Sequence, residues 1–154
     1  MDSKPGKRVV LLAIRPRFAE SIFNGEKKVE FRKIRFRQRI SHMVLYATKP
    51  IQKIVGYFYV RHVAENTPQY LWAHYRSVAG LNYEEFRDYY TSSSKGIAIE
   101  IGNTWKFRKP VPLSKLDNSF VIPQSFAYLP VEIFEAITNE YVEEDSVGPK
   151  ECKA

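Results

Sequence analysis

The sequence predicts an α+β fold, a sheet of strands flanked by short helices, from three observations. Several segments are rich in Val, Ile, Tyr and Phe, and some alternate between apolar and polar residues as half-buried strands do. Other segments repeat apolar residues at helical spacing behind helix-capping residues. The chain of 154 residues suits one ordinary core, and no repeat or linker divides it. We therefore expect one domain over residues 1–142 and a disordered acidic tail over residues 143–154.

A strand and a short helix precede the most charged stretch of the chain. Residues 8–14 form a nearly continuous aliphatic run, which is typical of a strand buried on both faces. Pro16 favours the start of a helix and Asn24-Gly25 favours its end, so a helix is expected near residues 17–24. Residues 29–37 then alternate between apolar and charged side chains and predict a strand. The alternation changes parity at Arg32-Lys33, which predicts a bulge or a bend.

The rest of the chain predicts further strands and helices. Strands are expected at residues 42–48, 53–63 and 96–102. Gly56 interrupts the second of these, where a bulge or a close backbone approach is expected. Pro110 and Pro112 restrict the extended segment that follows, residues 105–113, to a sheet edge. Helices are expected behind Thr67-Pro68, behind Asn82 and along a later apolar stripe, near residues 68–79, 83–90 and 131–137.

Positive charge is concentrated toward the N-terminus. The net charge is +7 and the pI is near 9.5, yet residues 1–49 carry a net +9 and the remaining residues a net −2. Such an uneven basic charge favours a polyanion as the partner. Arg35, Arg37 and Arg39 are expected to share one strand face, where salt and solvent, or an anionic ligand such as RNA, must offset their repulsion. We favour the ligand over a merely solvated face.

A nucleic acid would use aromatic and cationic side chains together. Bases stack on aromatic faces while phosphates contact cations, and predicted strands of this basic domain carry Tyr46, Tyr57, Phe58 and Tyr59, of which one or two would suffice to line a pocket. Most other rings of the chain are expected to belong to the core. We therefore predict a nucleic-acid interface made of Lys27, Lys28, Arg32, Lys33, Arg35, Arg37, Arg39, Tyr46 and Lys49.

One pair of residues is a candidate for catalysis. Lys27 follows a glycine turn, and Glu30 lies three residues later, where the two side chains can meet. A lysine that is partly desolvated and near other cations loses its proton readily, as a general base requires. Alternatively, Lys27, Glu30 and Arg32 form a salt-bridged network without a catalytic role. Because we expect an exposed Lys27 side chain, we also expect its replacement to change stability little.

Other chemistry has weak support in the sequence. The glycine turn before Lys27 lacks the pattern of a phosphate-binding P-loop, and the three histidines lack metal-ligand spacing, so we expect no metal and no cofactor. Ser125 is not part of a nucleophile-elbow motif. Cys152 lies in a polar tail, which fits a reducing compartment. No apolar run suits a signal peptide or a membrane span, and we expect a cytoplasmic protein without a membrane partner.

Residues 25–32, Gly-Glu-Lys-Lys-Val-Glu-Phe-Arg, follow the pattern G-x-K-x-x-E-x-R. Together with later blocks in matching order, this pattern resembles the ASCH domains, which are relatives of the PUA-like β-barrels. The later blocks lie at residues 45–50, 54–56, 71–72, 79–80, 83–86, 95–99 and 123–129. The resemblance covers about residues 8–130. It implies a mixed, mainly antiparallel PUA-like β-barrel with flanking helices, a cleft beside the signature, and RNA binding.

The resemblance also implies a possible activity. One bacterial branch with a similar fold hydrolyses acetylated cytidine. Lys27 matches its catalytic lysine, whereas Glu30 stands in the position of its threonine, and residues 78–81 contain no glutamate at its third position. Other ASCH proteins look like nucleases. Two hypotheses therefore remain: a module that binds RNA or a nucleotide, or a hydrolase, either a nucleoside amidohydrolase or a ribonuclease, that uses Lys27 as base and Glu30 as acid partner. The oligomeric state is not predicted.

Overall fold

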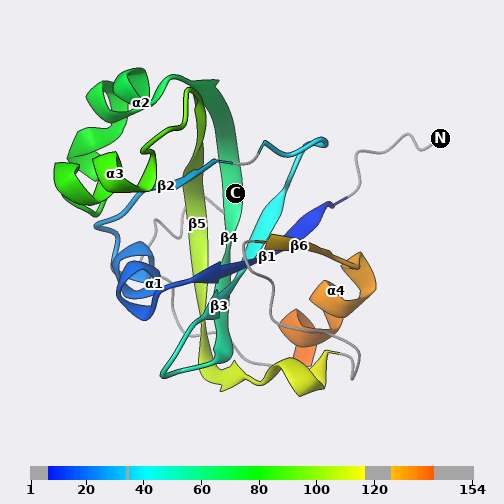
Figure 1. Ribbon diagram of the computed structural model, residues 1–154. Coiled ribbons are helices and arrows are strands. Elements are labelled where there is room, and N and C mark those ends of the chain that lie inside the picture. Colours follow the sequence, from blue (N-terminus) through cyan, green and yellow to red (C-terminus); the bar gives the residue numbers. More distant parts are fainter. Residues whose placement is uncertain (1–6, 34, 117–125, 141–154) are drawn as a thin grey trace.

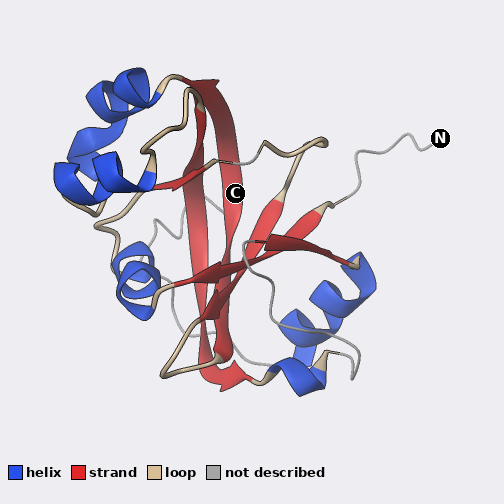
Figure 2. Ribbon diagram, in the orientation of Figure 1, coloured by secondary structure: helices blue, strands red, loops and turns tan. Residues whose placement is uncertain are grey.

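Within the residues that the computed structural model describes, 7–33, 35–116 and 126–140, six strands form one mixed sheet. The strand order is β2-β5-β4-β3-β1-β6. The sheet curls into a half-barrel with helices around it (Figure 1). This arrangement confirms the predicted α+β fold with a mainly antiparallel barrel. Figure 2 shows that α2 and α3 lie together at one end of the sheet, whereas α1 and α4 lie apart from them and from each other.

The elements follow one another along the chain with short connections. The strands are β1 (Val9–Ile14), β2 (Val29–Arg32), β3 (His42–Ala47), β4 (Lys53–Asn66), β5 (Gly96–Val111) and β6 (Phe126–Leu129). The α-helices are α1 (Pro16–Phe23), α2 (Pro68–Tyr75), α3 (Tyr83–Tyr89) and α4 (Val131–Glu140). Two short 3₁₀ turns are η1 (Arg76–Val78) and η2 (Leu113–Lys115).

Strand β1 lies inside the sheet, as its aliphatic sequence predicts. It pairs in parallel with β3 and antiparallel with β6, whereas the other ladders are antiparallel. Residues Val9 to Leu12 are each at most 1% exposed, since both faces of the strand are covered. Ala13 lies one residue beyond the last rung that β1 shares with β6. Among the described residues, Ala13 pairs with Tyr46 of β3 and has no partner on β6.

The long strands β4 and β5 form the spine of the sheet. Gly56 marks a shift of register in both ladders of β4, as predicted. A Cβ atom at Gly56 would lie 2.3 Å from the Trp105 carbonyl oxygen and 2.6 Å from Phe23 Cζ. A close backbone approach thus requires glycine at this position. The two segments predicted at 96–102 and 105–113 are one strand, whose second half pairs with β4 alone among the described residues.

Side chains of the described residues form three apolar clusters. The interior of the half-barrel is filled from β1, β3, β4 and β5 and from one face of α1, including Ile22 and Phe23. On the opposite face of the sheet, Phe134 and Ile137 of α4 pack over β1, β3 and β4. Helices α2 and α3 cover the outer face of β2, where Phe31 contacts rings on both helices.

Helix caps lie where the sequence predicts them. Pro16 and Pro68 occupy first helical positions of α1 and α2, and the Thr67 side chain accepts a hydrogen bond from the amide of Tyr70. Asn82 and Glu85 form a reciprocal capping box at α3. Gly25 ends α1 in the left-handed region at φ 89°. These local signals position the turn that carries Lys27.

The strand predicted over residues 29–37 is too long, because β2 ends at Arg32 and the described residues that follow, 33 and 35–41, form a loop. Arg32 pairs with Ile97, and β5 begins only one residue before Ile97, so the ladder could extend by one rung at most. In addition, the Tyr90 hydroxyl donates to the Arg32 carbonyl oxygen at 2.8 Å, which occupies the acceptor at the strand end. The predicted break at Arg32-Lys33 is therefore the end of a strand.

Strand β6 was not predicted. Its four residues between proline-containing segments are too few to show a periodic pattern, and it forms by pairing with β1. The tail at 143–154, with Cys152, and the candidate Ser125 lie outside the described residues.

Candidate functional site

A cleft of about 560 Å³ lies beside the signature segment. The end of β1, the turn before β2, β2 itself and helix α3 supply its walls. Its most buried polar members are Lys27, Glu30 and Arg32, which we call the ion-pair cluster. Apolar and rim residues complete the lining: Ala13, Ile14, Arg15, Phe18, Phe31, Thr48, Leu81, Glu85, Phe86, Asp88 and Tyr89.

Lys27 is buried at 2% exposure, so the expectation of an exposed side chain is wrong. Its Nζ atom donates a hydrogen bond to the Ala79 carbonyl oxygen at 2.7 Å and lies 3.6 Å from Glu30 Oε1. Gly80 packs on its methylene stem, since a Cβ atom at Gly80 would lie 2.7 Å from both Lys27 Cβ and Cγ. Phe18 covers the ammonium group from another side, with its ring centroid 5.0 Å from Nζ.

Burial lowers the pKa of Lys27 below the usual value of a lysine. The nearby Glu30 carboxylate acts in the opposite direction but is the weaker influence, while the charges of Arg32 and Arg17 lower the pKa further. The neutral amine is thus more accessible here than on an exposed lysine. Such an amine is suited to accept a proton.

Arg32 holds Glu30 and also closes the half-barrel. Its Nε and Nη2 atoms both lie 2.9 Å from Glu30 Oε2. Nη2 also donates to the Ala13 carbonyl oxygen on β1 at 2.9 Å. Strands β1 and β2 share no ladder in the described sheet, so this guanidinium joins two strands that are separate in the hydrogen-bonded order.

The sequence prediction that Lys27 and Glu30 meet is confirmed, and the salt-bridged network with Arg32 is present as well. A catalytic role for the pair stays a prediction. The segment in which the acetylated-cytidine hydrolases carry a glutamate supplies a backbone carbonyl to Lys27 instead, from Ala79.

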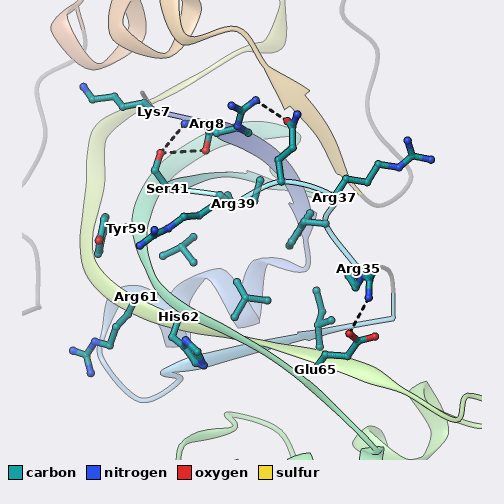
Figure 3. A pocket seen from close by; sticks show the side chains of 16 residues that line it. Lys7, Arg8, Arg35, Arg37, Arg39, Ser41, Tyr59, Arg61, His62 and Glu65 are labelled. Atoms are coloured by element: carbon teal, nitrogen blue, oxygen red, sulfur yellow. Dashed lines mark hydrogen bonds and ion pairs between the residues drawn. The ribbon is translucent and has the colours of Figure 1, made fainter. Parts of the chain in front are cut away.

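A second and larger hollow, of about 1110 Å³, lies between the loop at 33–41 and strands β4 and β5 (Figure 3). We call it the basic groove. Among the described residues that line it, the cations are Lys7, Arg8, Arg35, Arg37, Arg39 and Arg61, and Glu65 is the one carboxylate. This imbalance leaves a strongly positive concave surface, which attracts polyanions.

The three predicted arginines of the row all line this groove, but from a loop and in different orientations. Arg35 lies 3.3 Å from Glu65 and is partly neutralised. Arg39 extends across the hollow toward Tyr59, whereas Arg37 points away from it (Figure 3). Arg8 is held in place by the Gln38 side chain, to which it donates at 2.6 Å.

Tyr46 does not fit its predicted role. Its side chain is 2% exposed and belongs to the core cluster beneath α4, so it offers no accessible face to a base. The alternation of β3 predicts which residues share a face of the sheet, but not which face is covered. Helix α4 covers the face that carries Tyr46. Tyr46 therefore leaves the set of candidates.

The remaining predicted cations are exposed and lie outside the linings of both hollows. Lys28 and Lys49 are of this kind. Lys33 is exposed as well, and its Nζ atom lies 4.8 Å from the ring centroid of Tyr89 at the rim of the cleft. Neither Lys28 nor Lys49 contributes to the two hollows.

Sequence reasoning missed several residues of the site. Lys7 and Arg8, which precede β1, and Arg61 on β4 line the basic groove, and Tyr89 presents a partly exposed ring to the cleft. Tyr59 is one of the strand aromatics that the sequence suggests for stacking, and it lines the groove with a partly exposed ring that alternates with the buried Phe58 and Val60. No signal in the sequence brings Lys7 to residues 35–39, since this contact depends on the curl of the sheet.

Two features are absent from the described ranges. No group of three or more His, Cys, Asp or Glu side chains in them could hold a metal ion. None of their helices is long and apolar enough to cross a membrane.

Comparisons with known proteins agree with this geometry. The model of a family described as domain of unknown function DUF365 matches residues 8–121. An ASCH domain-containing ribonuclease of Zymomonas mobilis is 29% identical over 133 residues, which span 84% of this chain and 89% of that protein. The crystal structure of an ASCH protein from Zymomonas mobilis superimposes with a TM-score of 0.82 at 26% identity and covers 89% of this chain and 98% of its own.

A protein named ATP synthase subunit alpha, from Ureaplasma parvum, is 29% identical over 128 residues. That match spans 82% of this chain but only 16% of the Ureaplasma protein. The family match covers well over half of the chain, and the structural match covers nearly all of it. The chain belongs to the family described as domain of unknown function DUF365, and its fold is that of the ASCH proteins.

Proposed function

We propose that this protein binds RNA through the basic groove. The observation that carries the proposal is the composition of the groove: its lining contains six cations and one carboxylate among the described residues. Phosphate groups repeat along a nucleic-acid backbone, and a concave row of arginines neutralises several of them at once. The name of the Zymomonas relative, a ribonuclease, supports RNA as the polyanion.

The three arginines of the loop contribute unequally to this binding. Arg37 and Arg39 have no ion-pair partner among the described residues, whereas Arg35 lies beside Glu65 at 3.3 Å. A phosphate that contacts Arg35 must compete with this carboxylate. We therefore assign the largest share of the phosphate contacts to Arg39, which extends across the hollow, and smaller shares to Arg35 and to Arg37, which points away from the hollow (Figure 3).

Titration with single-stranded RNA at several salt concentrations tests the proposal. Each arginine that contacts a phosphate contributes roughly 0.7 to the slope of log affinity against log salt concentration. Arg39→Ala should lower the slope by about that amount, and Arg35→Ala and Arg37→Ala by less. Arg108→Ala removes an exposed arginine of β5 outside the groove and is the matched control. No measurable affinity at low salt would reduce the groove to a solvated surface.

The ion-pair cluster favours a second function, hydrolysis of RNA or of a modified nucleoside in the cleft. Lys27 is buried, has a lowered pKa and lies 3.6 Å from a carboxylate in a cavity large enough for a nucleoside. In this reaction the neutral Lys27 amine takes the proton of the attacking hydroxyl or water. The proton then reaches the leaving oxygen or nitrogen through Glu30, so that neither side chain keeps a charge change.

Lys27→Arg separates this function from a purely structural ion pair. Arginine keeps the positive charge next to Glu30, but it does not act as a base because its pKa is too high. If the cleft is catalytic, Lys27→Arg should lose turnover of RNA or nucleoside substrates while RNA affinity is kept. Arg108→Ala should retain turnover. If the wild type turns over none of these substrates, the ion-pair cluster serves the fold alone.

A further inference from the structure

An exposed aromatic ring lies inside the basic groove. Tyr59 on β4 is 44% exposed and lines the same hollow as the six cations. Arg39 extends toward it across the groove (Figure 3). Isolated exposed rings are common on protein surfaces, but a ring among cations in a concave surface combines the two groups that contact a single nucleic-acid strand.

The position of Tyr59 is fixed on several sides. A Cβ atom at Gly102 of the neighbouring strand would lie 3.0 Å from Tyr59 Cδ2 and from its carbonyl oxygen, so β5 passes close beside the ring. The His42 ring meets it edge-on with centroids 5.7 Å apart. The amide of Val60 donates to the Ser41 carbonyl oxygen at 2.8 Å. This bond anchors the end of the loop that carries Arg35, Arg37 and Arg39 next to Tyr59. Ring and loop are therefore held together before a ligand binds.

We propose that Tyr59 stacks against a base and that the basic groove is consequently a site for single-stranded RNA. This inference rests on the proposed RNA-binding function and names the form of RNA that the groove takes. Arg39 holds a phosphate of the strand, and the unstacked base turns toward Tyr59. In a duplex the bases are stacked on one another and paired, so none of them reaches the ring.

Stacking on an aromatic side chain changes affinity by an amount that is easily measured. Loss of one base–aromatic contact lowers affinity by about 5- to 150-fold. Stacking involves no phosphate, so the salt dependence of binding stays the same when the ring is removed. A phosphate contact shows the reverse behaviour, and the two kinds of residue can be told apart in one set of titrations.

The experiment uses two ligands: a short fluorescein-labelled oligoadenylate, and the same strand paired with oligouridylate as a duplex. Fluorescence anisotropy measures the affinity of the protein for each ligand at several salt concentrations. The variants are Tyr59→Ala, Tyr59→Phe, and Tyr59→Leu, which keeps apolar bulk without a π face. Tyr70→Ala removes a ring that is 49% exposed on α2, outside the groove, and is the matched control. Thermal unfolding of each variant checks that the fold is kept.

The wild type should bind the single strand more tightly than the duplex. Tyr59→Ala and Tyr59→Leu should lose about 5- to 150-fold in single-strand affinity with an unchanged salt slope, while Tyr59→Phe and Tyr70→Ala bind as the wild type does. Equal binding of both forms, or full affinity in Tyr59→Leu, would overturn the inference and leave RNA binding intact. If the wild type binds neither the single strand nor the duplex, both the proposed RNA-binding function and the inference about Tyr59 fail.

Discussion

The guanidinium of Arg32 on β2 donates to the backbone carbonyl of Ala13 on β1 at 2.9 Å. These strands lie on opposite sides of the strand order and pair with different neighbours. The same Arg32 holds Glu30 at 2.9 Å, and Glu30 in turn lies next to Lys27. The contact that closes the half-barrel therefore also orders the ion-pair cluster. Stability and the geometry of the cleft depend on one side chain.

Arg32→Ala should lower the free energy of unfolding by about 2–4 kcal/mol. Removal of one partner leaves Glu30 and the Ala13 carbonyl with unmet hydrogen-bonding capacity in a mostly buried place. Arg32→Lys should cost an intermediate amount, because a single ammonium does not reproduce the fork of the guanidinium. Urea denaturation measures both. Lys33→Ala changes the exposed neighbour and should stay within about 0.5 kcal/mol of the wild type. A cost for Arg32→Ala no larger than this would contradict its role in closure.

Gly80→Ala should displace Lys27. Gly80 has a φ of 74°, and its added Cβ would lie 2.7 Å from the Lys27 stem. We expect a loss of about 1–3 kcal/mol from backbone strain and overpacking together. In a Lys27→Gly background the Cβ, Cγ and Cδ atoms that cause the clash are all absent, and only the strain at residue 80 remains. A double-mutant cycle by chemical denaturation should therefore give a coupling of about 1 kcal/mol, and strict additivity would show that the two residues do not press on each other.

Local signals in the sequence predicted the turn and the pair that it positions. Gly25 ends α1 in the left-handed region, and the alternation that follows places Glu30 within reach of Lys27. The sequence did not predict that Lys27 is buried. Its cover comes from Ala79 and Gly80, more than fifty positions along the chain, and the resemblance to other ASCH sequences indicates the order of such segments but not what they touch.

The arginine row shows the same limit. Alternation predicted one strand face for Arg35, Arg37 and Arg39, yet the strand ends at Arg32, where β5 has only Gly96 left beyond Ile97 as a partner. All three arginines nevertheless reach one groove, since the loop that carries them is anchored at Ser41 to β4. The charge pattern of the sequence thus predicted that these arginines share a basic surface. It did not predict that a loop carries them, because this depends on where the neighbouring strand β5 begins.

His42 should make stability depend on pH in the acidic range. Burial, assisted by the charge of Lys7, lowers its pKa from 6.5 to about 4. Between these values the unfolded chain binds a proton that the folded protein does not, so stability present above pH 6.5 is lost as the pH falls toward 4. The loss is on the order of 1–2 kcal/mol, because the ring is only partly buried and solvent screens part of the effect.

His42→Phe should remove this contribution while it keeps a ring against Tyr57 and Phe134. Unfolding free energies of wild type and variant, measured from pH 7 to pH 4, give the difference that isolates His42 from the titrating carboxylates. His74→Phe replaces an exposed imidazole on α2 and serves as the control for a lost histidine. A difference that stays constant over this range would show that the His42 pKa is not lowered by folding.

Lys27 should act on stability at the other end of the pH scale. Its pKa is lowered by burial below the usual 10.5, so the folded protein releases this proton at a lower pH than the unfolded chain. Between the lowered value and 10.5 the unfolded state binds more protons, and stability therefore rises with pH in this window. Below the window both states carry the charge, and the cost of burying it is fully present.

Lys27→Met keeps the unbranched side chain and removes the charge. Tyrosines with raised pKa values, such as Tyr75, also titrate at alkaline pH, but they do so in both proteins and cancel in the difference. The unfolding free energy of the wild type minus that of Lys27→Met should increase as the pH rises from neutral toward 10.5, in denaturation curves recorded at each pH. A difference that decreases would mean that pairing with Glu30 outweighs burial, in which case Lys27 stays charged and has no lone pair to offer as a base.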